Sequence, residues 1–157
     1  MLDINHIVVP TDFSDISKQA LATAFELAKK HGAKLDVIHV FESPSFPSFY
    51  GAGALLMYGE VPDIKAQADA ALQKLVLPYK EAAGVDVSAE VLEGHAAEQI
   101  CSYATEAEAD LIIIPTYGLT GLKHVLLGSV AERVVRHART PVLVYKSEKV
   151  DTLSKAA

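Results

Sequence analysis

The sequence predicts a doubly wound α/β fold, in which a five-stranded parallel sheet carries helices on both faces. Short apolar segments alternate with longer amphipathic ones along most of the chain, which is typical of βαβ units. The most hydrophobic segment, Leu111 to Ile114, lies late in the chain, and a strand that is apolar throughout is expected at the centre of a sheet. With 157 residues, half of them hydrophobic, the chain is long enough to bury the core of one domain.

Each strand is predicted from a short run of apolar or alternating residues that ends near a turn-forming residue. The first run is interrupted only by Asn5 and His6 and stops at Pro10. In chain order the five predicted strands are Ile4 to Pro10, Leu35 to Phe41, Val85 to Leu92, Leu111 to Ile114 and Pro141 to Tyr145.

The four helices are predicted from apolar side chains three or four residues apart. Ser14 or Asp15 caps the first helix, and Gly32 supplies the position at which it ends. Pro62 suits the first turn of the second helix, and Ser129 begins the fourth. The predicted buried faces are Leu21, Ala24, Leu27 and Ala28; Ala68, Ala71, Leu72, Leu75 and Tyr79; Ala97, Ile100, Cys101 and Ala104; and Ala131, Val134, Val135 and Ala138.

In such a sheet the functional crevice lies at the carboxyl ends of the strands, where the strand order reverses. The loops expected there are Pro10 to Ser14, Val40 to Glu42, Gly94 to His95 and Pro115 to Ser129. A long connection from Glu42 to Glu60 carries four aromatic residues, and loops of that length are often lids or partner surfaces.

Net charge, hydrophobic segments and cysteine content argue against several classes of protein. The net charge of −6 argues against a general nucleic-acid binder, which needs a basic face. No segment approaches the roughly 18 apolar residues of a membrane span, and the first ten residues do not resemble a secretory signal. Cys101 is the only cysteine, so no internal disulfide can form. We therefore expect a cytoplasmic protein with no nucleic-acid or membrane partner.

The strongest motif runs from Pro115 to Ser129 and joins a buried strand to a helix. Gly118 and Gly121 allow a tight turn and the close approach of a ligand to the backbone. Gly128 and Ser129 stand at a helix start, where free N–H groups favour a phosphate. The alternative is a tight loop with a serine cap and no ligand.

Several motifs in order along the chain resemble the universal stress protein family, from about Asn5 to Lys146. Val-Val-Pro-Thr-Asp-Phe-Ser ends at Ser14, and Gly118 is followed after nine residues by Gly128-Ser129. His39-Val40, Leu92-Glu-Gly94 and the helix sequence Ser-Val-Ala-Glu-Arg-Val-Val-Arg-His-Ala before Thr-Pro-Val-Leu-Val also match.

The resemblance implies strand order 3-2-1-4-5, a homodimer and, in one subgroup, ATP bound with Mg²⁺ that is held through the phosphates. It places the adenine at Asp12 and Val40, the ribose and phosphates along the loop that starts at Pro115, and the phosphates at the start of the last helix. The residues expected to bind nucleotide are Pro10, Thr11, Asp12, Val40, Pro115, Thr116, Gly118, Gly128, Ser129 and Val130.

The resemblance also divides the chain into a nucleotide-binding domain, residues 1–147, and a flexible C-terminal tail, residues 148–157. The homodimer is expected to use the edge strand Pro141 to Lys146, which is too apolar to leave exposed. One residue departs from the subgroup's pattern: Pro115 replaces a glycine and has no N–H to donate.

Other residues in the motifs have structural alternatives. Asp12 could cap the first helix or fix its own turn. His39 and His95 could form a metal pair, although two histidines without a third ligand are weak evidence. Lys123 and His124 could reach phosphates from their loop. For two further groups the structural role is the favoured one: Arg136, His137 and Arg139 complement a helix dipole, and Cys101 belongs to the core.

The chain has no Gly-Lys-Ser/Thr phosphate loop, dinucleotide glycine motif, Ser-His-Asp order or paired carboxylates. The only catalysis that this leaves open is slow ATP turnover. Three functions compete: a dimeric ATP-binding switch with an unidentified protein partner, a nucleotide-free dimeric interaction module, and a very slow ATPase. Retention of Asp12, Gly118, Gly128 and Ser129 favours the first.

Overall fold

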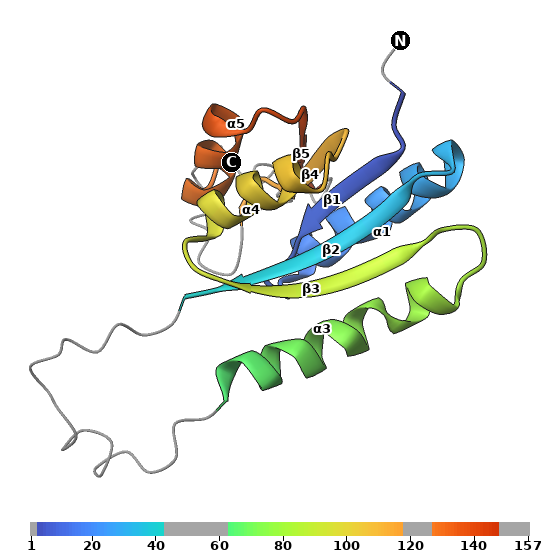
Figure 1. The fold of residues 1–157 in the computed structure, drawn as a ribbon, viewed down its shortest axis with the longest axis horizontal. Helices are drawn as coiled ribbons and strands as arrows, with labels where there is room; N and C mark the ends of the chain where they lie inside the picture. The colour runs from blue at the N-terminus through green and yellow to red at the C-terminus, as the bar shows by residue number, and fades with distance from the viewer. Residues whose placement is uncertain (1–2, 43–62, 118–126, 148–157) are drawn as a thin grey trace, which may run out of the picture.

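The computed structural model describes residues 3–42, 63–117 and 127–147, in which strands and helices alternate (Figure 1). The strands are β1 (His6–Pro10), β2 (Lys34–Phe41), β3 (Val87–Glu93), β4 (Leu111–Pro115) and β5 (Val142–Tyr145). The helices are α1 (Asp15–His31), α3 (Ile64–Glu81), α4 (Ala96–Glu106) and α5 (Ser129–His137).

The five strands form one parallel sheet in the order β3-β2-β1-β4-β5, as the sequence predicts. All five residues of β4 are buried, which agrees with its continuous apolar sequence. The strand order reverses between β1 and β4, and there the ladder is short: β1 pairs with β2 at five positions but with β4 only at Ile7 and Val8.

Each face of the sheet is covered by two helices (Figure 1). On one face, α1 and α3 bury Leu21, Phe25 and Leu72 against the sheet. On the other face, α4 and α5 bury Ile100 and Val134. Helix α4 also packs on α5, so the position of α5 depends on α4.

The local signals for helix ends are confirmed at α1. The Ser14 side chain accepts a hydrogen bond from the N–H of Ser17 at 3.3 Å and caps the helix. Gly32 ends the helix with φ of +67°, a conformation that costs glycine little.

Two predicted core positions are wrong. Val135 is 46% exposed, because the buried face of α5 is made by Ala131 and Val134. Ala71 is exposed on α3, whose buried residues are Ala68, Leu72 and Val76. Helix α3 begins after Asp63, which caps it, while the predicted Pro62, most of the long loop and the tail 148–157 lie outside the described residues.

None of the helices in the described ranges combines the length and the apolar character needed to cross a membrane.

Candidate functional site

Strands β1 and β4 both end in proline at the switch point, at Pro10 and Pro115. The amides of a parallel strand alternate between its two neighbours. The N–H of Thr11 donates to the Ile38 carbonyl of β2, and that of Thr116 donates to the Tyr145 carbonyl of β5, both at 2.9 Å. The nitrogens of Pro10 and Pro115, one residue earlier, therefore face the space between β1 and β4. Since proline has no N–H, the ladder cannot continue there, and the two strands are free to part.

The turn after β1 is shaped by its own side chains. The Asp12 carboxylate accepts the N–H of Ser14 at 3.0 Å, and the Thr11 hydroxyl accepts that of Phe13 at 3.1 Å. Phe13 has a φ of +65°, an unusual value for a residue with a side chain. The structural alternative for Asp12, fixing its own turn, is thus confirmed. Asp12 remains half-buried at the carboxyl end of β1.

Strand β2 ends beside this turn. Nδ1 of His39 lies 2.8 Å from the Thr11 carbonyl oxygen, and the His39 ring packs on Phe13 with centroids 4.5 Å apart. The half-buried Val40 follows.

The metal-pair alternative gains no support, because His95 instead faces Glu42 at 3.2 Å. Residues 3–42, 63–117 and 127–147 contain no group of three histidine, cysteine or acidic side chains placed to hold a metal ion.

The end of β4 and the start of α5 touch. The N–H of Gly128 donates to the Thr116 carbonyl oxygen. A Cβ at position 128 would lie 3.2 Å from that oxygen and 3.3 Å from Cα of Tyr117, so glycine allows a closer approach of the two backbone segments than a larger residue would. Within the described part of the chain the buried Thr116 hydroxyl has no hydrogen-bond partner, and a buried polar group without a partner is costly.

Helix α5 begins at Ser129 with no side-chain cap. Its first N–H with an intrahelical partner is that of Glu132, which donates to the Gly128 carbonyl. The earlier amides of Ser129 and Val130 have no partner within the helix. They form the positive end of the helix dipole beside Thr116.

The structure therefore places nine of the ten predicted residues at the carboxyl ends of β1, β2 and β4 or at the start of α5. They are Pro10, Thr11, Asp12, Val40, Pro115, Thr116, Gly128, Ser129 and Val130. Gly118, Lys123 and His124 lie outside the described residues. Arg136 and His137 occupy the last turn of α5, where Arg136 pairs with Glu132 at 2.7 Å. Burial raises the pKa of the half-buried Cys101 thiol, as expected for a packed side chain rather than a nucleophile.

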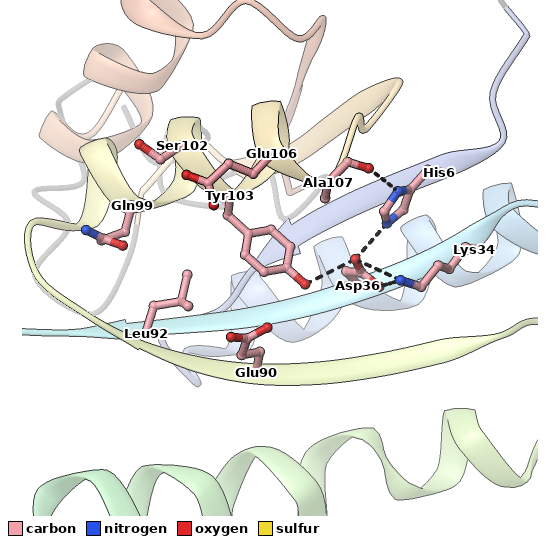
Figure 2. Close-up of a pocket in the computed structure, with 10 residues that line it drawn as sticks. All are labelled: His6, Lys34, Asp36, Glu90, Leu92, Gln99, Ser102, Tyr103, Glu106 and Ala107. Carbon is pink, nitrogen blue, oxygen red and sulfur yellow. Dashed lines mark hydrogen bonds and ion pairs between the residues drawn. The ribbon is translucent and has the colours of Figure 1, made fainter.

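Sequence reasoning missed a polar cluster near the amino ends of the strands. Asp36, on β2, is 1% exposed and bonds to Ser88 and to three side chains drawn in Figure 2, those of His6, Lys34 and Tyr103. We call these five residues the Asp36 cluster. It borders a cavity of about 420 Å³ between β3 and α4. The sequence feature that could have revealed the cluster is the carboxylate of Asp36 within the apolar run of β2. Buried acidic residues are nearly always paired, so this carboxylate implied partners nearby.

The parallel sheet, with its strand order reversing between β1 and β4 and helices on both faces, defines a doubly wound α/β protein. A family model described as the universal stress protein family matches residues 3–146. The chain belongs to the universal stress protein family.

Comparisons with individual proteins support the same family. Universal stress protein MJ0531 of Methanocaldococcus jannaschii is 41% identical over 143 residues, which is 91% of this chain and 82% of that protein. The solved structure of universal stress protein UspA from Lactobacillus plantarum is 26% identical, with a TM-score of 0.74 over 90% of this chain and 97% of that one. A crystal structure of a universal stress protein in complex with cAMP is also 26% identical, with a TM-score of 0.67 over 92% and 98% of the two chains.

Proposed function

We propose that the chain is a dimeric, cytoplasmic stress-response regulator that binds ATP with Mg²⁺ at the carboxyl ends of β1 and β4. The family supports a stress-related role, and a similar universal stress protein has been crystallised with the nucleotide cAMP. A single half-buried cysteine is compatible with a reducing compartment.

The observation that carries the nucleotide proposal is the contact between Thr116 and Gly128. The Thr116 hydroxyl, which has no hydrogen-bond partner among the described residues, would gain an acceptor or donor from a ligand at this position. The glycine lets the backbone of Thr116 and Tyr117 pack closely against the start of α5, where the amides of Ser129 and Val130 would receive the phosphates. Gly118, in the connecting loop, would complete this phosphate region.

The other proposed contacts come from β1 and β2. Pro10, Thr11 and Asp12 would line one side of the crevice, with Asp12 and the backbone of Val40 at the adenine. Pro115 would adjoin the ribose. No acidic cluster for a metal is present in the described ranges, so Mg²⁺ would be held through the phosphates.

A regulatory role fits these residues better than rapid catalysis. The proposed site offers backbone amides and hydroxyls for binding, but no paired carboxylates or nucleophile with an adjacent base. Bound ATP would therefore act as a signal that an unidentified protein partner reads, and any hydrolysis would be slow.

Calorimetry and thermal unfolding test this proposal. Millimolar ATP with Mg²⁺ should release or absorb heat and raise the melting temperature, because a ligand selective for the folded state stabilises it. Absence of both effects would leave the nucleotide-free interaction module as the better reading.

The variant Gly128→Val locates the phosphates. It should weaken ATP binding by about tenfold or more, because the side chain fills the space beside Thr116. It should also lower the melting temperature, since the same side chain presses on the Tyr117 backbone.

Gly84→Val is the matched control. It strains a glycine with φ of +101°, has open space for its side chain and lies near the amino ends of the strands. It should destabilise the fold without weakening ATP binding. Equal weakening in both variants would mean that the effect at Gly128 is a general loss of stability.

A further inference from the structure

The Asp36 cluster draws together β1, β2, β3 and α4 at one buried carboxylate. Oδ1 of Asp36 accepts from the Ser88 hydroxyl, and Nζ of Lys34 forms an ion pair with the carboxylate, 3.0 Å from Oδ1. Oδ2 accepts from the Tyr103 hydroxyl at 3.1 Å and lies 2.6 Å from Nε2 of His6. Figure 2 shows the side chains of His6, Lys34 and Tyr103 converging on Asp36 beside the cavity.

Both ring nitrogens of His6 face oxygens that only accept hydrogen bonds. Nε2 faces the Asp36 carboxylate, and Nδ1 lies 3.0 Å from the carbonyl oxygen of Ala107. A neutral imidazole carries one N–H and can satisfy only one of the two oxygens, so the other contact sets a lone pair against an oxygen. A protonated imidazole donates to both.

The place of Ala107 adds a second reason for a positive charge. Ala107 is the C-cap residue of α4, and the last turn of α4 contains no basic residue. A cation near a helix C-terminus interacts favourably with the helix dipole. His6, which comes from β1, is in position to supply the charge that the sequence of α4 lacks.

We propose that His6 is a proton-dependent latch between the sheet and the C-terminal end of α4. When the ring is protonated, it ties β1 to Asp36 on β2 and to the Ala107 carbonyl. When the ring is neutral, it keeps the bond to the charged, closer carboxylate and gives up the one to Ala107. The latch lies at the amino ends of β1 and β2, opposite the proposed ATP site, and does not depend on that proposal.

The surroundings allow such a switch. His6 is partly accessible, with a side chain 14% exposed, and the cavity gives solvent a route to the cluster. Several titratable or charged groups flank the ring from the packed elements. They are Lys34 and Asp36 on β2, Glu90 on β3, Tyr103 and Glu106 on α4, and Asp110 before β4, which accepts the N–H of His6 at 3.0 Å.

Imidazole is the group in this set that ordinarily titrates near neutral pH, whereas carboxyl, lysine and tyrosine side chains ordinarily do not. Two of the neighbours are biased further away from that range. Burial, then the charge and hydrogen bond of Asp36, raise the pKa of Tyr103. Burial acts to raise the pKa of Asp36, but its bonds to Ser88, Lys34 and His6 outweigh burial and lower it.

Nitrogen-15 NMR of the imidazole rings in the full chain tests the latch directly. At a pH low enough to protonate the ring, both nitrogens of His6 should carry protons, and at a higher pH that leaves the ring neutral, only Nε2 should. A neutral ring with its proton on Nδ1 at the higher pH, or no change across the range, would overturn the proposal.

Amide hydrogen exchange then tests the effect on α4. After correction for intrinsic exchange, protection of the amides at Ala107 and Ala109 should fall about tenfold between those pH values, as expected for loss of one charge-assisted hydrogen bond. The uncharged variant His6→Gln should show no such dependence on pH. The control His31→Gln, which changes an exposed histidine in α1, should behave like the parent. Retention of the pH dependence in His6→Gln would refute the latch.

Discussion

Pro115 has no backbone N–H, and this affects both the β4 strand and the proposed binding of a ligand beside it. It is the last residue of β4, buried, with its nitrogen on the side of the crevice. Any other residue would place an N–H there, in reach of a ligand between β1 and β4. The proline also stiffens the backbone, which lowers the entropy lost on folding. In the proposed ATP binding, the missing N–H donor and the stiffer backbone act in opposite directions.

We expect Pro115→Ala and Pro115→Gly both to tighten ATP binding by up to about tenfold, the value of one hydrogen bond. Pro115→Gly should also cost about 0.5–1 kcal/mol of folding stability, and Pro115→Ala less, since alanine restores the donor with less backbone freedom. Calorimetry and thermal unfolding measure the two effects. Weaker ATP binding in both variants would show that the proline contributes shape rather than a missing donor.

Asp36 gives the protein a component of acid sensitivity. Its bonds hold its pKa below the ordinary value despite burial, so the folded state prefers the carboxylate. The stability that this provides is present above the unfolded pKa of about 4 and is lost as the pH falls through the lower folded value.

We therefore expect the unfolding free energy of Asp36→Asn to fall less than that of the parent as the pH drops below about 4. At neutral pH the same variant should be destabilised by about 1.5–3 kcal/mol, because the neutral amide cannot replace the charge-assisted hydrogen bonds that the carboxylate accepts from Ser88 and Tyr103. Urea unfolding at a series of pH values measures both effects. Asp86→Asn, which changes an exposed carboxylate just before β3, is the control. If the two variants have the same acid profile, Asp36 is not the group responsible.

These residues also show what the sequence alone could not reveal. The positions of Asp12, Gly128 and Ser129 at the ends of elements were predictable, because each belongs to a local motif next to a strand or helix. The partners of Asp36 are far apart in the sequence: His6 is 30 residues away and Tyr103 is 67. Only the packing of α4 over the sheet brings them together. The burial of the Thr116 hydroxyl without a partner in ranges 3–42, 63–117 and 127–147 likewise depends on its three-dimensional surroundings.

At the scale of helices and strands, local sequence signals were sufficient to predict which elements exist and in what order they follow along the chain. Ser14 and Gly32 mark the ends of α1, and Pro10 ends β1, because capping and loss of an N–H are properties of single residues. Orientation was less predictable. Val135 fits the apolar stripe of α5 but is exposed, because the width of a buried face is set by the neighbouring helix, here α4, and not by periodicity.

At the scale of the whole molecule, the sheet separates the proposed ATP site from the proposed latch. One lies at the carboxyl ends of the strands and the other near their amino ends, with α4 packed along the same face as α5 (Figure 1). The alternation of strands and helices predicted a parallel, doubly wound sheet, and the resemblance to the family supplied its strand order, which right-handed connections alone do not fix. Assembly depends on what the edges of the sheet expose.

Strand β5 is an edge strand with apolar character. Leu143 is 39% exposed, and Val142 and Val144 are only partly buried. The carbonyls of Pro141 and Tyr145 accept hydrogen bonds from β4, so by alternation the N–H and C=O groups of Val142 and Val144 point outward. An unpaired apolar edge favours pairing with another chain, and antiparallel pairing of two β5 strands would satisfy both copies.

We expect the protein to be a homodimer through Pro141 to Lys146, with a mass by light scattering of twice the 16.8 kDa of one chain at micromolar concentration. Leu143→Lys should shift the mass toward one chain, because a charge on an edge strand opposes pairing. Its melting temperature at high dilution, where the parent also dissociates, should change little, since Leu143 is not in the core. Leu77→Lys introduces the same charge at a leucine on α3 that is 51% exposed and should remain dimeric. A mass of one chain for the unmodified protein would refute the dimer. An unchanged dimer in Leu143→Lys would instead move the interface away from β5.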